Sequence, residues 1–193
     1  MSVEAGSPQQ TRGFGPSALV TPANGITAAR LLATPLMVLL ITQRGASWVG
    51  VTAWFVLSCT DGVDGILARR QGATTSGAFL DPLADKICVL AAMAALVATG
   101  RWWFLPVAVI FAREIVQTVW RARLSRRGIS VPATKWAKIK TWLQDLSVGA
   151  ALLPWTSAHH AFVQTILWSA VILTVVTGAQ YLWAGRRSQA VLS

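Results

Sequence analysis

Residues 61–86 read DGVDGILARRQGATTSGAFLDPLADK and contain four aspartates, Asp61, Asp64, Asp81 and Asp85, within an otherwise apolar chain. An ionised carboxylate at membrane depth is costly unless a counter-charge accompanies it. A cluster of four carboxylates is most simply balanced by bound divalent metal. The stretch therefore predicts a functional site, in preference to four solvated carboxylates at the ends of loops.

The spacing of these aspartates predicts how they converge. Asp61 and Asp64 are three residues apart and Asp81 and Asp85 are four apart, so on helices each pair lies on one face. The intervening QGATTSG is typical of a turn. We expect a helix, a short loop and an antiparallel second helix. Hard oxygen ligands suit Mg²⁺ or Mn²⁺, which usually keep positions open for water and phosphate oxygens.

The composition is that of an integral membrane protein. Of 193 residues, 54% are hydrophobic and only 12% are charged, and ten are Trp. The mean hydropathy is +0.53. The formal charge of +10 is compatible with nucleic-acid binding, but the placement of the basic residues argues against that class. The two cysteines lie in apolar segments and form no disulfide framework.

Hydrophobic runs predict an all-α membrane domain over residues 22–193, preceded by a flexible or surface-lying tail at 1–21 that does not have the features of a cleavable signal peptide. The domain is expected to contain six transmembrane helices and a basic polar linker at 121–140. The expected spans cover approximately residues 24–43, 47–61, 77–100, 102–120, 141–155 and 161–183, and the fifth span could begin as early as Lys135.

The basic residues predict the orientation of this domain. Six spans place both termini on one side, together with Arg69, Arg70, the 121–140 cluster, Arg186 and Arg187. By the positive-inside rule, that side is cytoplasmic. We therefore expect a multi-pass plasma-membrane protein whose aspartates face the cytoplasm. Tryptophans near the span ends are expected to form aromatic belts: Trp48, Trp102, Trp103 and Trp155 outside, and Trp120, Trp136, Trp142 and Trp183 inside.

The order Asp61-x-x-Asp64-Gly65-x-x-Ala68-Arg69, then Gly77-x-x-x-Asp81-x-x-x-Asp85, resembles the signature of the CDP-alcohol phosphotransferases. Seven residues separate Arg69 from Gly77, where eight is usual, so we expect a shortened turn and an intact site. The segments NGITAAR (24–30), FAREIVQTVWR (111–121) and KWAKIKTWLQ (135–144) extend the likeness, and the last two resemble the bacterial phosphatidylglycerolphosphate synthases of that family.

The resemblance implies a magnesium-dependent enzyme of phospholipid biosynthesis, a transferase that converts CDP-diacylglycerol and sn-glycerol 3-phosphate into phosphatidylglycerol phosphate and CMP. Two metal ions are implied, one held by Asp61, Asp64 and Asp81 and one by Asp61, Asp81 and Asp85. Asp85 is also implied to be the catalytic base. Gly65, Ala68, Arg69 and Gly77 are implied to bind CDP-diacylglycerol. The family likeness further implies a homodimer.

The acceptor phosphate needs cations, and the positions that match the family are Arg113, Arg121, Lys138 and Lys140, with Thr27 and Arg30 as further candidates that could serve either substrate. Some of these residues could instead have a structural role. Arg113 and Glu114 could instead form an ion pair that joins the fourth and fifth spans. The lysines could instead be ordinary positive-inside charge.

The sequence is also compatible with two other functions. A cardiolipin synthase of the same family would use phosphatidylglycerol as acceptor, and it would need a second lipid-sized opening and less phosphate-binding charge. A divalent-cation transporter would carry acidic residues at several depths along its spans. In this chain the aspartates at 61–85 cluster at one face, with only Glu4, Glu114 and Asp145 elsewhere.

Overall fold

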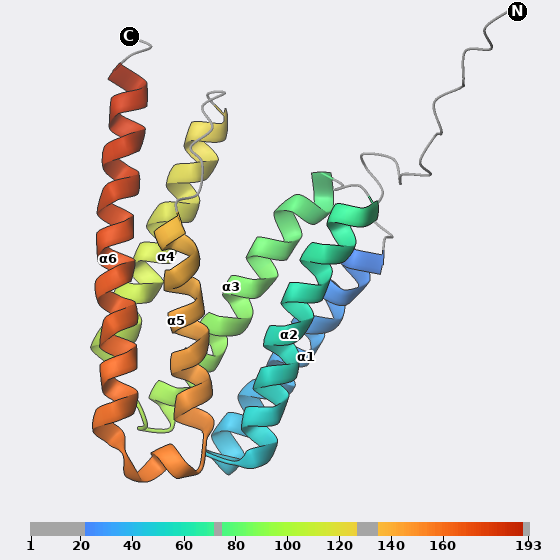
Figure 1. The fold of residues 1–193 in the computed structure, drawn as a ribbon, viewed down its shortest axis with the longest axis vertical. Helices are drawn as coiled ribbons and strands as arrows, with labels where there is room; N and C mark the ends of the chain where they lie inside the picture. Colours follow the sequence, from blue (N-terminus) through green and yellow to red (C-terminus); the bar gives the residue numbers. More distant parts are fainter. Residues whose placement is uncertain (1–21, 72–74, 127–134, 191–193) are drawn as a thin grey trace, which may run out of the picture.

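The computed structural model describes residues 22–71, 75–126 and 135–190, and these form six α-helices that run up and down (Figure 1). The prediction of an all-helical fold with six long helices is confirmed for this part of the chain. The tail at 1–21 lies outside the described residues. The elements are α1 (Pro22–Arg44), α2 (Trp48–Gln71), α3 (Thr75–Ala98), α4 (Phe104–Arg126), α5 (Lys135–Leu152), the 3-10 helix η1 (Trp155–Ala158) and α6 (His160–Ala190).

Two described segments are long and apolar enough to cross a membrane, Gly25–Arg44 in α1 and His160–Gln180 in α6. Their 20 and 21 residues correspond to about 30 Å of helix, the thickness of a bilayer's hydrocarbon core. A shorter apolar segment, Trp48–Thr60, lies in α2. The model thus contains membrane-length helices, and the count of six spans stays a prediction.

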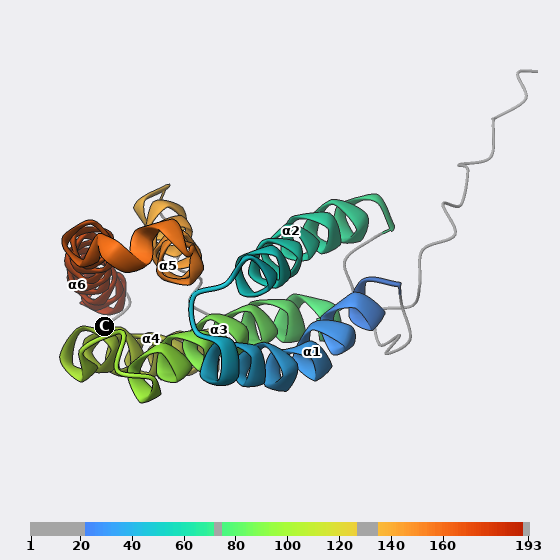
Figure 2. The same cartoon turned by 90° about the horizontal axis from the view of Figure 1, so that it is seen from below.

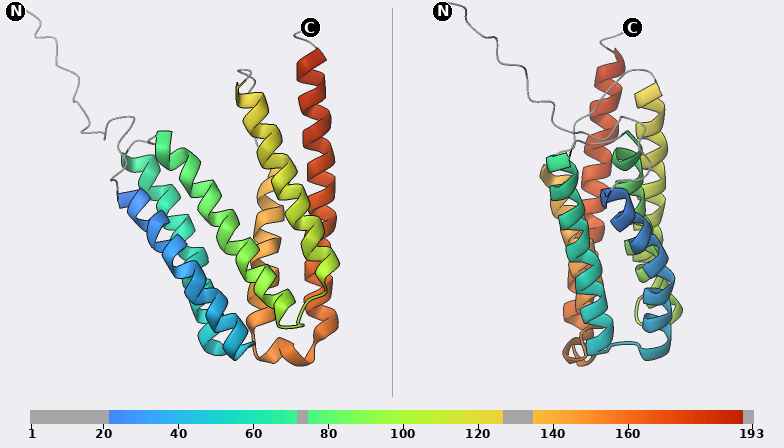
Figure 3. Two further views of the ribbon diagram at one scale, coloured as in Figure 1. Left: turned by 180° about the vertical axis from the view of Figure 1, so that it is seen from behind. Right: turned by 90° about the vertical axis from the view of Figure 1, so that its right-hand side faces the viewer.

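The helices form two groups of three, which lean away from each other toward the end that carries the termini (Figure 3, left). Seen from below, α4, α3 and α1 lie in one row, with α6, α5 and α2 above it (Figure 2). In the first group α1 packs against both α2 and α3. In the second group α6 packs against both α4 and α5. Contacts of α3 with α4 and α5, and of α2 with α5, join the two groups. Any site between α3 and α5 is therefore built from both groups.

The apolar core lies toward the end of the bundle opposite the chain termini. It comes from the second halves of α1, α3 and α5 and the first halves of α2, α4 and α6, which meet at that end (Figure 1). Most of the buried polar side chains of the described residues lie nearer the end that carries the termini, and Thr156 in η1 is an exception. The core includes Met37, Ile41, Trp54, Met93, Leu96, Ile110, Leu152 and Leu167, and the buried polar residues include Thr27, Arg30, Glu114, Lys140, Gln144 and Thr174.

A tight turn connects α3 to α4 at the apolar end. Gly100 has φ +70°, a left-handed conformation that favours glycine. The backbone N–H groups of Arg101 and Trp102 donate to the carbonyl of Leu96, at 3.0 and 3.2 Å. This turn directs Trp102 into the core, where it is 3% exposed. The expectation that Trp102 belongs to an outer aromatic belt is wrong, whereas Trp48, Trp103 and Trp155 are exposed at this end.

The two described parts of the basic segment at 121–140 are helical, so α4 and α5 extend into the stretch expected to be a polar linker. Helix α4 continues to Arg126 and α5 begins at Lys135, while residues 127–134 lie outside the described part. Arginine, lysine, alanine and leucine are good helix formers, so the loss of hydrophobicity after Trp120 does not end the helix. Arginines in the last turns of α4 also interact favourably with the negative end of its dipole.

Candidate functional site

The backbone is helical at all four aspartate positions. Helix α2 is continuous through positions 61 and 64, and α3 is continuous through positions 81 and 85. Each pair therefore lies on one face of its helix. Of the four, only Asp85 has a described side chain, which is partly buried. The side chains of Asp61, Asp64, Asp81, Ala68 and Arg69, and the surroundings of Gly65 and Gly77, lie outside the described residues, so these assignments stay predictions.

Glu114 is the centre of a cluster of polar side chains, called the Glu114 cluster or the polar cluster below. Its side chain, on α4, is 5% exposed and contacts three cations. Lys140 from α5 donates to Oε1, and Arg113 Nη1 lies 2.8 Å from the same oxygen. Lys86 Nζ from α3 lies 3.3 Å from Oε2. One carboxylate thus connects three helices, which matches the structural interpretation of an ion pair between the fourth and fifth spans and extends it to the third.

Arg113 is directed mainly toward α6. Its Nε donates to the carbonyl of Thr174 at 3.2 Å, and its Nη2 donates to Oγ1 of Thr177 at 3.0 Å. Gly178 makes room for this side chain, since a Cβ there would lie 3.3 Å from both Cγ and Nε of Arg113. Gln144 of α5 also donates to Oγ1 of Thr174, at 3.3 Å. The guanidinium therefore helps to hold α4 and α6 together.

A small pocket of about 40 Å³ adjoins Asp85. Its wall comes from α3, α4 and α5, and the described side chains that form it do not include Arg113. The Lys140 side chain is 6% exposed, so its ammonium group has little access to water, whereas the Lys86 side chain is 30% exposed. The pocket is lined by Asp85, Lys86, Val89, Leu90, Glu114, Lys140, Thr141 and Gln144.

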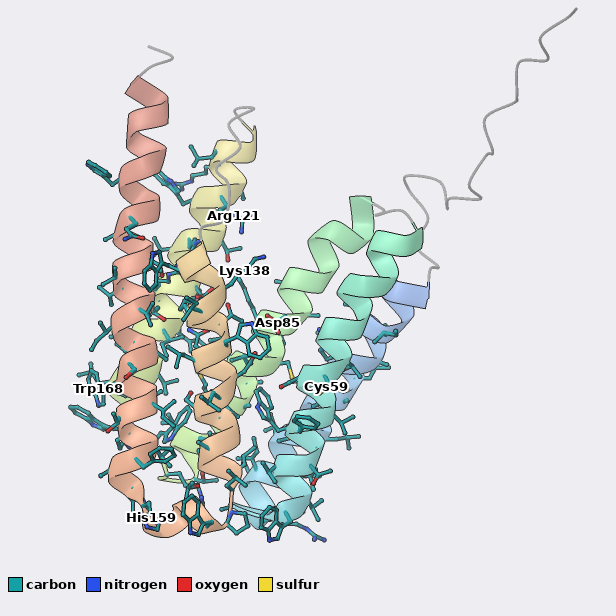
Figure 4. All side chains as sticks on the ribbon, viewed as in Figure 1. Cys59, Asp85, Arg121, Lys138, His159 and Trp168 are labelled. Carbon is teal, nitrogen blue, oxygen red and sulfur yellow. The ribbon has the colours of Figure 1, made fainter. Side chains whose placement is uncertain are left out.

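The other predicted acceptor residues occupy two places. Thr27 and Arg30 are buried on α1, at 2% and 3% exposure. Arg30 and Asp85 both act electrostatically on Cys88 of α3, which places them in one neighbourhood. Arg121 and Lys138 are exposed, and Figure 4 shows both above Asp85, toward the end that carries the termini. Of the predicted acceptor residues, only Lys140 lines the Asp85 pocket.

Several residues of the site were not predicted from the sequence. Lys86, Thr118, Gln144, Thr174 and Thr177 all take part in the polar cluster. Lys86 directly follows the last aspartate of the signature, and the other four are polar residues in apolar helices. Such residues signal buried polar contacts, although the sequence does not say which partners they meet.

The donor set fits a hard divalent cation. Carboxylates at i, i+3 on one helix and i, i+4 on the next supply only oxygen ligands, which Mg²⁺ and Mn²⁺ prefer. Of these carboxylates, Asp85 lines a pocket to which Lys86 and Lys140 contribute positive charge. The arrangement can bind an anionic group and accept a proton beside it.

Comparison with known proteins agrees with this chemistry. A family model described as CDP-alcohol phosphatidyltransferase matches residues 20–176. The matched region contains α1 to α5 and the first half of α6, and therefore every described residue of the polar cluster except Thr177 and the adjoining Gly178.

Relatives with known names cover most of the chain. A "Probable phosphatidylglycerophosphate synthase" of Mycobacterium tuberculosis (strain CDC 1551 / Oshkosh) is 36% identical over 176 residues, covering 87% of this chain and 83% of the relative. The "CDP-diacylglycerol--glycerol-3-phosphate 3-phosphatidyltransferase" of Bacillus subtilis (strain 168) is also 36% identical over 176 residues, covering 82% and 91%. The protein of the same name from Haemophilus influenzae is 31% identical over 171 residues, covering 84% and 92%.

Proposed function

Because this chain belongs to the CDP-alcohol phosphatidyltransferase family, we propose that it transfers the phosphatidyl group from CDP-diacylglycerol to sn-glycerol 3-phosphate, giving phosphatidylglycerol phosphate and CMP. The names of the relatives support this donor and this acceptor. The structural observation that carries the proposal is the pocket in which Asp85 lies beside Lys86 and Lys140. To react, a phosphorylated alcohol needs a base for its hydroxyl proton and positive charge nearby for its phosphate.

Asp85 acts as the general base in the proposed reaction. Its carboxylate takes the proton from a hydroxyl of glycerol 3-phosphate, and the hydroxyl oxygen forms a bond to the phosphorus that carries diacylglycerol. The bond from this phosphorus to the bridging oxygen of the pyrophosphate breaks, and CMP leaves with the electron pair. Lys140 holds the acceptor phosphate, and Arg113, Arg121 and Lys138 add positive charge nearby. Thr27 and Arg30 line the approach from α1.

The donor side of the proposed site is the aspartate signature. Asp61, Asp64 and Asp81 would hold one divalent ion, and Asp61, Asp81 and Asp85 would hold a second. When bound, two Mg²⁺ or Mn²⁺ ions supply positive charge that balances the pyrophosphate and the leaving CMP. Gly65 and Gly77 allow the nucleotide to approach the helices closely, as does the small Ala68, and Arg69 contacts a phosphate or the nucleotide.

The proposed setting is the plasma membrane, with six spans and both termini in the cytoplasm. The alternating direction of the helices places both ends of the described chain on one side (Figure 1). The exposed Arg121, Arg123 and Lys138 lie on that side, where anionic headgroups favour them. The pocket then meets a lipid donor and a soluble acceptor at the cytoplasmic interface. We further propose that the enzyme is a homodimer.

The proposed function is tested by CMP release from CDP-diacylglycerol by the purified protein with Mg²⁺. Glycerol 3-phosphate, phosphatidylglycerol, inositol phosphate and serine are compared as acceptors, and EDTA is the control for the metal. We expect release with glycerol 3-phosphate only, and none after EDTA. Release with phosphatidylglycerol alone would assign the protein to cardiolipin synthesis, and no release with any acceptor would refute a phosphatidyltransferase.

A further inference from the structure

The Glu114 cluster carries more positive charge than its carboxylate can balance. Lys86, Arg113 and Lys140 all contact this one side chain, so three positive charges meet one negative charge and two are left over. Counting Asp85, which lines the same pocket, leaves one positive charge in excess among these five described side chains. Like charges gathered in a poorly solvated site are costly unless an anion joins them. An anion bound beside these five side chains would balance that excess.

Lys86 is the cation best placed to meet that anion. Glu114 already has Lys140 and Arg113 on Oε1, so Lys86 is not needed to neutralise it. Lys86 is also the most accessible of the three, at 30% exposure against 6% for Lys140 and 11% for Arg113. Its Nζ is oriented by Oγ1 of Thr118, at 2.9 Å, and by Glu114. These are its two contacts within the part of the chain that the structure describes, and an ammonium group has three N–H donors.

We propose that Lys86 binds the phosphate group of the acceptor, on the α3 side of the Asp85 pocket, and that Glu114 and Thr118 position it there. The inference rests on the proposed function and deepens it by adding a cation to the acceptor site. Lys86 and Lys140 lie against the two oxygens of one carboxylate, so their ammonium groups approach the pocket from α3 and α5. A phosphate between them would accept hydrogen bonds from both sides while its hydroxyl-bearing carbon chain extends toward Asp85.

The test uses the full-length enzyme in detergent and three variants. Lys86→Met removes the charge and keeps the length of the side chain, and Lys86→Arg keeps the charge. Arg123→Met is the matched control, because Arg123 is exposed near the cytoplasmic end of α4 and lies outside the pocket. Removing one charge-assisted hydrogen bond to phosphate should raise KM for glycerol 3-phosphate about ten- to a hundredfold. KM for CDP-diacylglycerol should change less than about twofold.

Binding of inorganic phosphate, measured by calorimetry, separates this inference from the proposed reaction. We expect wild type and Arg123→Met to bind phosphate equally, Lys86→Met to bind at least about tenfold more weakly, and Lys86→Arg to recover most of the affinity. Equal phosphate affinity in Lys86→Met and wild type would overturn the inference, as would the absence of phosphate binding by wild type. If wild type binds phosphate through Lys86 but releases no CMP with glycerol 3-phosphate, the proposed acceptor fails and the anion site stands.

A merely structural role for Lys86 predicts a different pattern. Loss of the contacts to Glu114 and Thr118 would lower the thermal unfolding midpoint. It would also reduce kcat, and kcat/KM would fall together for CDP-diacylglycerol and for glycerol 3-phosphate. If Lys86→Met does not purify as a folded protein, Lys86→Gln replaces it, since its amide can still donate to Thr118. Selective loss of acceptor affinity in either variant supports the inference, and unchanged acceptor affinity in a folded variant refutes it.

Discussion

Asp85 and Glu114 are carboxylates on neighbouring helices that border one pocket, and their different surroundings fit the different tasks that we propose for them. Glu114 is 5% exposed and is held by three cations. Asp85 is only partly buried, one helical position before Lys86, and its carboxylate borders the space where a substrate would bind. A base must reach the proton that it removes, whereas a structural carboxylate must stay paired.

Replacing Asp85 with Asn tests the first task. Asn keeps the shape of the side chain but cannot accept the proton, so turnover should fall by at least about a hundredfold. Binding of CDP-diacylglycerol should be partly retained, because three other aspartates of the signature remain. CMP release and equilibrium binding of the lipid donor measure the two effects. Turnover at the wild-type rate in Asp85→Asn would exclude the assigned role.

Replacing Glu114 with Gln tests the second task. Gln has a similar volume but leaves Lys86, Arg113 and Lys140 without their shared negative charge. Breaking a buried ion pair of this kind costs on the order of 3 kcal/mol, so the unfolding midpoint in detergent should fall clearly. Glu114→Asp, which keeps the charge on a shorter side chain, should lose less. A midpoint for Glu114→Gln equal to that of wild type would show that the cluster does not hold the helices together.

At the scale of helices, Gly178 allows α4 and α6 to approach each other. A larger side chain would meet Arg113, which is anchored by hydrogen bonds to Thr174 and Thr177 and cannot easily move away. Gly178→Val should therefore destabilise the protein by about 1–3 kcal/mol through overpacking.

Gly25→Val is the matched control for this prediction, because a Cβ at Gly25 has no heavy atom of another side chain within 4 Å. Both changes introduce the same β-branched residue into a helix, so their intrinsic propensity costs are similar. The difference between the thermal unfolding midpoints of the two variants in the same detergent therefore measures the cost of overpacking at Gly178. Equal unfolding midpoints would mean that Arg113 moves aside at little cost.

The sequence predicts the helices better than their ends. The spans that become α1 and α6 follow directly from long apolar runs, since hydrophobicity decides where a chain can enter a bilayer. The end of α4 at Arg126 does not follow from hydrophobicity, because helix propensity and the helix dipole continue the helix into polar sequence. Trp102 shows a similar limit, since a turn at Gly100 decides which way it faces.

For the site, the sequence reveals which residues are unusual but not which of them meet. The signature aspartates and Lys140 are recognisable because charge in apolar sequence needs a reason. The partners of Glu114 come from three helices, so they depend on how these helices pack. Residue spacing within one helix does not predict that packing. For this reason the sequence does not single out Lys86, although it adjoins Asp85.

At the scale of the whole molecule, the orientation in the membrane can be tested with cysteine labelling. On a background of Cys59→Ala and Cys88→Ala, single cysteines replace His159 and Arg123, which are exposed at opposite ends of the bundle. A membrane-impermeant maleimide should label His159→Cys in intact cells, and Arg123→Cys only after permeabilisation. The reverse pattern would place the Asp85 pocket outside the cytoplasm.

The division of the bundle into two groups of three helices has a consequence for how such an enzyme can diversify. The signature aspartates belong to α2 and α3, whereas Glu114, Lys140 and Gln144 belong to α4 and α5. Substitutions in the second group can therefore change the shape and charge offered to an alcohol without altering the helices that carry the signature aspartates. Lys86, on α3 but in contact with Glu114 of α4, lies where the two groups meet.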